Sequence, residues 1–77
     1  MEHPLIERNP EVMNGKPVIK DTRLTVELIL ERLADGFSNQ ELLDNYPRLT
    51  QEGIQAALNY AADLVHIEAT KEERAAS

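Results

Sequence analysis

The sequence contains no cysteine, no tryptophan and only two histidines among its 77 residues. Without cysteine there are neither disulfide bridges nor thiolate ligands for a metal. The two imidazoles, His3 and His66, lie toward opposite ends of the chain, and neither has a second histidine at ligand spacing. We therefore expect neither a metal site nor a bound cofactor.

Long apolar runs are also missing. The longest, residues 26–30, is interrupted by Glu27 and is far shorter than the ~20 residues that a membrane-spanning helix needs. The first residues, Met-Glu-His-Pro, lack the basic region and apolar core of a signal peptide. These absences predict a cytoplasmic protein that is not associated with a membrane. A chain of this length forms one domain at most, and its small core favours association with another chain.

Positive charge is scarce in the second part of the sequence. The net charge of −6 comes from eight Lys and Arg against fourteen Asp and Glu. Residues 1–25 hold four basic and four acidic side chains, whereas residues 26–77 hold four basic and ten acidic ones. All the net negative charge therefore lies in the second part, which weakens a nucleic-acid role because affinity for DNA depends on cations that contact phosphate.

The first 25 residues have the signals of an extended arm with turns. Asn9-Pro10 is typical of a turn, and Asn14-Gly15 is the strongest short hairpin signal, because both residues accept φ > 0 in a two-residue type I′ turn. Pro17 cannot donate a ladder hydrogen bond, so a strand here is short or at an edge. We expect an extended N-terminal arm with a hairpin over residues 1–25, and strand-like pieces near residues 4–7 and 17–20.

Helix signals begin at Thr25. Thr25, Ser38 and Thr50 are expected N-caps, and Glu41 completes a capping box with Ser38. Gly36 is placed to end the first helix. The predicted helices cover residues 26–35, 39–46 and 51–67.

These helices define the predicted fold class. Residues 26–68 form a mainly α, three-helix helix-turn-helix domain with a short N-terminal β-like arm, because short turns join the helices. Residues 69–77 are charged or small and are expected to form a frayed C-terminal tail. A three-helix bundle without a nucleic-acid role has the same pattern.

The third predicted helix carries two apolar stripes. At 100° per residue, the expected core stripe consists of Ile54, Ala57, Leu58, Ala61 and Val65. A second stripe, about 120° away, consists of Tyr60, Leu64 and Ile67. The arm folded back over this second stripe would explain it as core, whereas a second subunit or a partner protein would explain it as an interface. We assign it to an interface and expect a homodimer, because pairing of two chains covers both the stripe and the edge strands.

The same helix is a poor candidate for DNA recognition. Residues 51–67 contain no Lys or Arg, and Glu52 and Asp63 repel phosphate. The candidate nucleic-acid contacts are therefore cations of the arm and of the turn before the third helix: Lys16, Lys20, Arg23 and Arg48. Ordinary solvated charge is the alternative interpretation of these residues.

No motif indicates catalysis. The candidate hydroxyl groups are accounted for as caps, and Gly15-Lys16 lacks the remainder of a phosphate-binding loop. We assign no catalytic residue. The sequence predicts a protein that binds a macromolecular partner and is not an enzyme.

Several segments together form a recognisable pattern. Residues 14–26 are Asn-Gly-Lys-Pro-Val-Ile-Lys-Asp-Thr-Arg-Leu-Thr-Val, residues 36–38 are Gly-Phe-Ser, and residues 45–50 are Asn-Tyr-Pro-Arg-Leu-Thr. With Ala-Leu-Asn-Tyr-Ala at residues 57–61, they resemble the domain-of-unknown-function-433 family of short prokaryotic proteins, over roughly residues 6–65. The family often has Gly before Thr-Arg, where this sequence has Asp21.

This resemblance implies a homeodomain-like helix-turn-helix fold and an antitoxin-like function. Many relatives are described as VapB-type antitoxins, encoded beside a toxin of PIN-like fold, and such antitoxins bind the toxin and, with it, their operator DNA. The implied protein is a regulatory module of a toxin–antitoxin pair, and Arg23 is the motif residue for which we expect a binding role. The alternative, which the acidic second part favours, is a non-DNA-binding protein-interaction domain.

Overall fold

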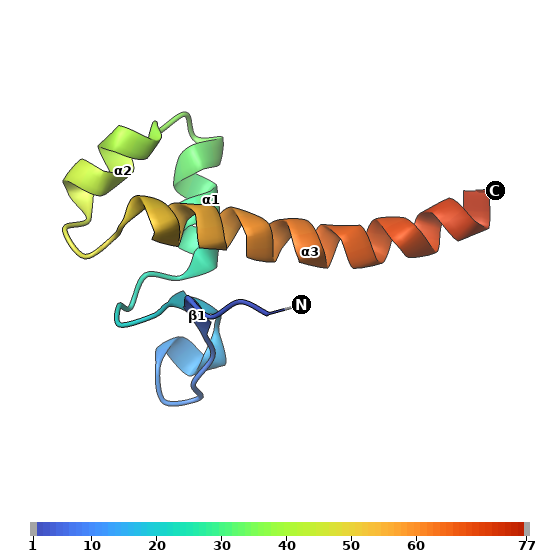
Figure 1. Ribbon diagram of the computed structural model, residues 1–77, viewed down its shortest axis with the longest axis horizontal. Coiled ribbons are helices and arrows are strands. Elements are labelled where there is room, and N and C mark those ends of the chain that lie inside the picture. The colour runs from blue at the N-terminus through green and yellow to red at the C-terminus, as the bar shows by residue number, and fades with distance from the viewer. Residues whose placement is uncertain (1, 77) are drawn as a thin grey trace.

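The computed structural model describes the backbone of residues 2–76 and the side chains of residues 2–66. A two-stranded sheet precedes three helices along this part of the chain (Figure 1). The strands are β1 (Ile6–Glu7) and β2 (Val18–Ile19), with a 3-10 turn, η1 (Met13–Gly15), between them. The helices are α1 (Val26–Ala34), α2 (Asn39–Asn45) and α3 (Gln51–Ala76). The predicted mainly helical architecture, with three helices after a short β-like arm, is confirmed.

Side-chain caps explain where the helices begin. The hydroxyls of Thr25, Ser38 and Thr50 each accept a hydrogen bond from the backbone N–H three residues later, at 3.0, 3.1 and 3.0 Å. The Glu41 carboxylate accepts from the Ser38 N–H at 3.0 Å and completes the capping box. Gly36, which follows α1, has a φ of +99°, a left-handed conformation that glycine adopts without steric cost. All of these cap predictions are confirmed.

The arm pairs differently from the predicted hairpin. β1 and β2 are antiparallel, with Ile6 opposite Ile19, so residues 8–17 connect them. The two-residue turn at Asn14-Gly15 forms, with positive φ at both residues (+57° and +79°) and a hydrogen bond from Lys16 N to Met13 O at 3.1 Å, but it lies inside this connection, and the prediction that strands pair directly on either side of it is wrong. The observed pairing instead brings Ile6 and Ile19 against the core.

The core lies where the three helices meet β2. Its buried apolar side chains are Ile19, Val26, Ile29, Leu42, Leu49, Ile54 and Ala57. Gly53 permits the close approach of α3 to β2, because a Cβ at this position would lie 3.3 Å from Ile19 Cγ2 and 3.2 Å from Leu49 Cδ1. The start of α3 is therefore fixed against the sheet.

The ends of α1 and α2 are joined by one arginine. A side-chain hydrogen bond with Tyr46 raises the pKa of Arg32, and the nearby Asp35 carboxylate, 3.9 Å away, adds to this effect. The guanidinium carbon also lies 5.9 Å from the centroid of the Phe37 ring. Because arginine is charged at any physiological pH, this is a structural contact.

Helix α3 extends well past the other helices (Figure 1). With 26 residues and a rise of 1.5 Å per residue, it is about 39 Å long. The backbone of residues 68–76 is helical where we expected the helix to have ended and the chain to fray. This stretch contains neither Gly nor Pro and is rich in Ala, Glu, Lys and Arg, which are strong helix formers.

Two residues assigned to the core stripe of α3 lie on the surface. Ile54 and Ala57 are completely buried, but Leu58 is 38% exposed and Val65 is 63% exposed. The prediction is therefore wrong for Leu58 and Val65. Helical periodicity gives the direction of a side chain around the axis, whereas burial also depends on how far along the axis the neighbouring elements reach.

Candidate functional site

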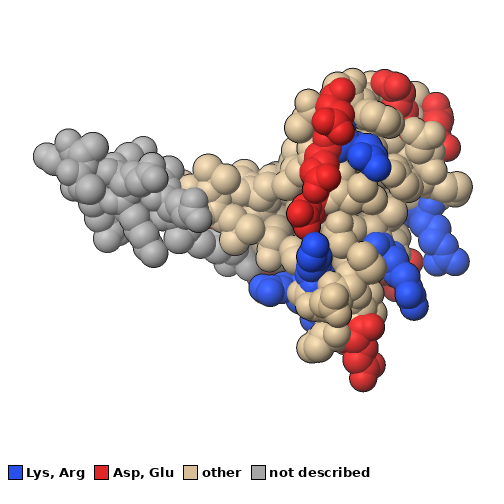
Figure 2. Space-filling view, turned by 180° about the vertical axis from the view of Figure 1, so that it is seen from behind, with Lys and Arg blue, Asp and Glu red and all other residues tan. Residues whose placement is uncertain are grey.

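Charge is unevenly distributed over the surface. Figure 2 shows Lys and Arg side chains gathered over the lower part of the globular end, and Asp and Glu side chains in a column above them. Acidic side chains also lie at the lower tip of this face, so positive and negative side chains are mixed there (Figure 2).

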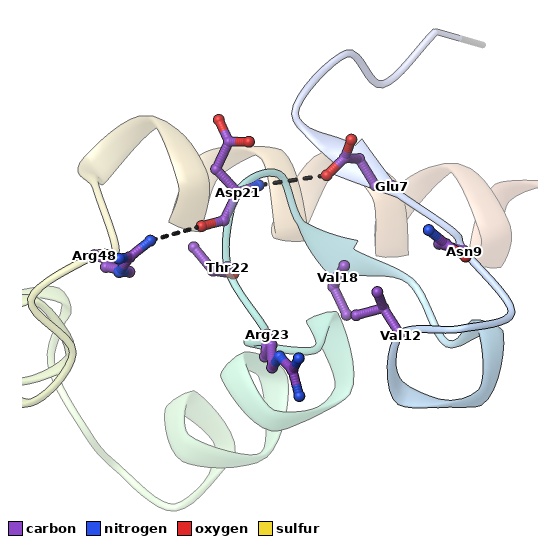
Figure 3. Close-up of a pocket in the computed structure, with 8 residues that line it drawn as sticks. All are labelled: Glu7, Asn9, Val12, Val18, Asp21, Thr22, Arg23 and Arg48. Carbon is purple, nitrogen blue, oxygen red and sulfur yellow. Dashed lines mark hydrogen bonds between the residues drawn. The ribbon is translucent and has the colours of Figure 1, made fainter.

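A groove of about 600 Å³ opens between the arm and the turn that joins α2 to α3 (Figure 3). Its walls come from β1 and the connection that follows it, from the β2–α1 loop and from the α2–α3 turn. The residues that line it are Glu7, Asn9, Val12, Val18, Asp21, Thr22, Arg23 and Arg48. Three segments that are distant in the sequence therefore build one surface.

The loop between β2 and α1 is closed by Thr22. Its hydroxyl donates to Ile19 O at 2.7 Å and accepts from Leu24 N at 3.0 Å, while Ile19 N donates to Leu24 O at 2.9 Å. This closed loop turns at Asp21, whose φ is +64°. Aspartate is one of the few residues besides glycine that tolerate this region. Asp21 therefore takes the left-handed conformation at the position where a glycine is common in the family that the sequence resembles.

The backbone of Asp21 links the two walls of the groove. Its N–H donates to Glu7 Oε1 at 3.3 Å, and its carbonyl accepts from Arg48 Nη1 at 3.4 Å (Figure 3). Both distances are long for hydrogen bonds. A guanidinium has five N–H donors, and this contact uses one of them. The Arg48 side chain is thus held at the groove while it keeps donors for a ligand.

The four predicted nucleic-acid contacts are not equivalent. Arg23 and Arg48 line the same groove, and Lys20 lines an adjoining one that also includes Arg48. Lys16 lies elsewhere, with its Nζ 3.0 Å from Glu27 Oε1 of α1. The structure therefore brings Lys20, Arg23 and Arg48 together and pairs Lys16 with a carboxylate.

The three predicted interface residues differ in how far their side chains are exposed. Tyr60 is half-buried and packs against the core, and its ring meets the His3 ring edge to face with centroids 5.1 Å apart. Leu64 is 50% exposed, and the side chain of Ile67 lies outside the described residues. The arm covers the stripe at Tyr60 and leaves Leu64 exposed, and the assignment of the stripe to an interface stays a prediction.

Comparison with known proteins places this arrangement in a family. The family model for a protein of unknown function, DUF433, matches residues 6–61, which is more than half of the chain. The chain belongs to the DUF433 family. It is 34% identical to the crystal structure of a DUF433 member from Anabaena variabilis, with a TM-score of 0.74, over 92% of this chain and 68% of that one.

A curated relative extends the comparison to a longer protein. The uncharacterized protein y4eO from Sinorhizobium fredii is 32% identical over 57 residues, which are 74% of this chain and 26% of that protein. The DUF433 chain therefore spans about a quarter of the length of the curated relative that it matches.

Several residues that line the groove of this DUF433 chain, or that hold its arm against α3, have no signal in the sequence. Glu7 and Asn9 gave no signal, because they enter the groove only through the pairing of β1 with β2. His3 and Asp63 are far apart in the sequence, yet their Nε2 and Oδ2 atoms lie 2.7 Å apart. A local pattern contains no information on such a contact.

The described part of the DUF433 chain contains no cluster of three or more side chains suited to hold a metal ion. Within the same residues, no helix combines the length and the apolar character that crossing a membrane requires.

Proposed function

We propose that the protein is a cytoplasmic, antitoxin-like regulatory module, which acts by binding a partner protein and does not catalyse a reaction. The observation that carries the proposal is the exposed apolar surface of α3, formed by Leu58 and Val65 of the first stripe, which are 38% and 63% exposed, and by Leu64 of the second stripe, about 120° away around the helix, which is 50% exposed. Large apolar side chains gathered on the surface of a small domain commonly mark an interaction site. We refer to these three residues as the α3 surface.

The size of the α3 surface limits what it contributes. Complete burial of such a side chain is worth about 1.5–3 kcal/mol, so covering the parts that are still exposed contributes about 2–4 kcal/mol before the costs of association. A nanomolar complex needs about 12 kcal/mol. A partner that binds tightly must therefore contact more of the protein than these three residues.

The resemblance of the sequence motifs to antitoxin-like relatives supports a toxin of PIN-like fold as this partner. A helix that extends past its own domain suits a groove on another protein, which contacts one face over several turns. Two copies of the chain that meet along α3 about a two-fold axis cover the same surface, and we include such a homodimer in the proposal. A protein-interaction domain with another partner is the alternative use of this surface.

Co-purification with the small protein encoded by the adjacent gene tests this proposal. We expect the wild-type chain to retain that protein and Leu64→Asp to weaken its binding at least tenfold, because a carboxylate would be buried without a partner charge. Gln51→Asp is the matched control, since it adds the same charge to the first turn of α3, where a carboxylate is favourable. Retention of the neighbour by Leu64→Asp with unchanged affinity would refute the assignment of the α3 surface.

A second function, contact with operator DNA, is supported by the grouping of Lys20, Arg23 and Arg48. These cations line adjoining grooves, and a homodimer doubles their number. Within the homeodomain-like helix-turn-helix fold implied by the resemblance, DNA would then be contacted through the arm and the α2–α3 turn. The described side chains of α3 offer no cation to phosphate.

A mobility-shift assay over a salt series tests the DNA contact. Each lost phosphate contact lowers the slope of log affinity against log salt by about 0.9. Replacement of Lys20, Arg23 and Arg48 by Gln should therefore lower it by nearly three for each protomer bound. Lys16→Gln is the control and should change the slope by less than one contact, because Lys16 is paired with Glu27. Tight binding by the triple variant with an unchanged slope would exclude these residues.

A further inference from the structure

The N-terminal arm closes on α3 at a single side chain. His3 Nε2 lies 2.7 Å from Asp63 Oδ2, and the His3 ring stands edge to face on the Tyr60 ring at an interplanar angle of 75°. The His3 side chain is only 15% exposed, and that of Asp63 is 39% exposed. His3 therefore sits between the arm and the helix.

The chemistry of this contact depends on a proton. A carboxylate only accepts hydrogen bonds, so Nε2 at this distance must carry a hydrogen, either in the neutral Nε2–H tautomer or in the imidazolium. Nε2 is also buried without an aligned hydrogen-bond partner, so the contact is an ion pair when the ring is protonated and lacks a well-aligned hydrogen bond in either state. Protonation of the His3 ring adds an attraction between its positive charge and the Asp63 carboxylate, and loss of the proton removes this attraction.

The rest of the arm is loosely attached. A cavity of about 270 Å³ lies between residues 2–5 and the α3 residues Glu52, Gln55, Ala56 and Asn59. Among the described residues, the first backbone hydrogen bond that joins the arm to a distant segment is from Lys20 N to Leu5 O, at 2.7 Å. Residues 2–4 therefore lie over α3 with a local backbone hydrogen bond, from Ile6 N to His3 O at 3.0 Å, while the first backbone bond to a distant segment comes only at Leu5.

We propose that residues 2–4 form a strap over α3, that His3 with Asp63 is its catch, and that its opening exposes Tyr60 to the partner protein. Tyr60 and Leu64 are one helical turn apart, so the area under the strap is continuous with the exposed Leu64. The strap competes in cis for part of the face that the partner takes. The identity of the partner rests on the proposed function, but the closure of the strap does not.

The charges around His3 set the direction of the effect. Asp63 faces the ring from α3, Glu2 precedes it in the arm, and Glu52 lies across the cavity. All three side chains are acidic. His66, three residues after Asp63, is a second imidazole on the same helix, and the variant His66→Ala separates its effect from that of His3. The charge of a protonated His3 ring adds to the attraction of these carboxylates, so we expect a protonated ring to hold the strap closed more tightly.

Nuclear Overhauser contacts between the rings of His3 and Tyr60 in the full-length protein test the strap without any partner. We expect a strong contact at pH 5 and a weak one at pH 8 in the wild type. Asp63→Asn should weaken it at pH 5, because the charge attraction is removed. His66→Ala should behave as the wild type, and the amide signals of Ile29 and Leu42 show whether each variant keeps its core. A contact of equal strength at both pH values and in Asp63→Asn would overturn the proposal.

Affinity for the protein encoded by the adjacent gene tests whether the strap competes with the partner. If the strap is closed in most molecules, His3→Ala should bind that protein about three- to tenfold more tightly at pH 5, because the competent fraction rises. Equal affinity of wild type and His3→Ala at pH 5 would overturn the competition. If neither binds, the proposed function fails, and the ring contacts still decide whether the strap exists.

Discussion

The first half of α3, up to Tyr60, belongs to the core, whereas the second half extends away from it (Figure 1). Ile54 and Ala57 are completely buried in the first half, and Leu64 and Val65 are 50% and 63% exposed in the second. Both halves show apolar residues at helical spacing. The comparison teaches that the same pattern makes a core where α1, α2 and β2 lie opposite the helix, and a surface where they do not.

The largest effect should come from a cavity in the first half. Ile54→Ala removes a side chain that is completely buried, and such substitutions lower the free energy of unfolding by about 2–5 kcal/mol. This is a large share of the stability of a small domain. Urea denaturation followed by circular dichroism measures it. A loss below about 1 kcal/mol would mean that the two halves differ less than their burial indicates.

The same substitution placed in each half gives a sharper comparison. Ala→Gly in a helix costs about 1 kcal/mol of helix propensity wherever it occurs. Ala57→Gly should lower the global free energy of unfolding by about 1–2 kcal/mol, because it also removes a buried methyl group. Ala62→Gly, at an exposed position, should lower the helical content but change global stability by no more than about 0.5 kcal/mol. Equal global losses would show that the second half is coupled to the core.

Local chemistry explains how much of this fold could be predicted. The hydroxyls of Thr25, Ser38 and Thr50 cap the helices as expected, because capping involves residues only three apart. The Asn14-Gly15 turn adopts positive φ, as its sequence favours. The strand β1, which pairs with β2, nevertheless ends at Glu7, well before this turn. Turn chemistry fixes a local conformation, whereas pairing is decided by which side chains reach the core.

The sequence predicts only part of the candidate site, because it gives the residue types but not which distant segments meet. Arg23 and Arg48 were selected from the sequence, and the structure places both in one groove. Lys16 was selected with them, but Glu27, eleven residues later, lies beside it. The approach of His3 to Asp63 depends on the path of the whole arm. Residue types were therefore predictable, and their distances were not.

The smallest effect on stability, and the most informative one, should come from the second half. Leu64→Ala removes as many carbon atoms as Ile54→Ala. The Leu64 side chain, however, is already 50% exposed in the isolated chain. We expect the free energy of unfolding of the isolated chain to change by no more than about 0.5 kcal/mol, as for other surface substitutions. Because the proposed partner buries Leu64, the affinity for that partner should nevertheless fall by about tenfold, which corresponds to about 1.4 kcal/mol.

Urea denaturation at low protein concentration and the affinity for the adjacent gene product separate the two effects. A loss of stability close to that of Ile54→Ala, still present on dilution, would show that Leu64 is covered within its own chain, and the difference between the two halves of α3 would disappear.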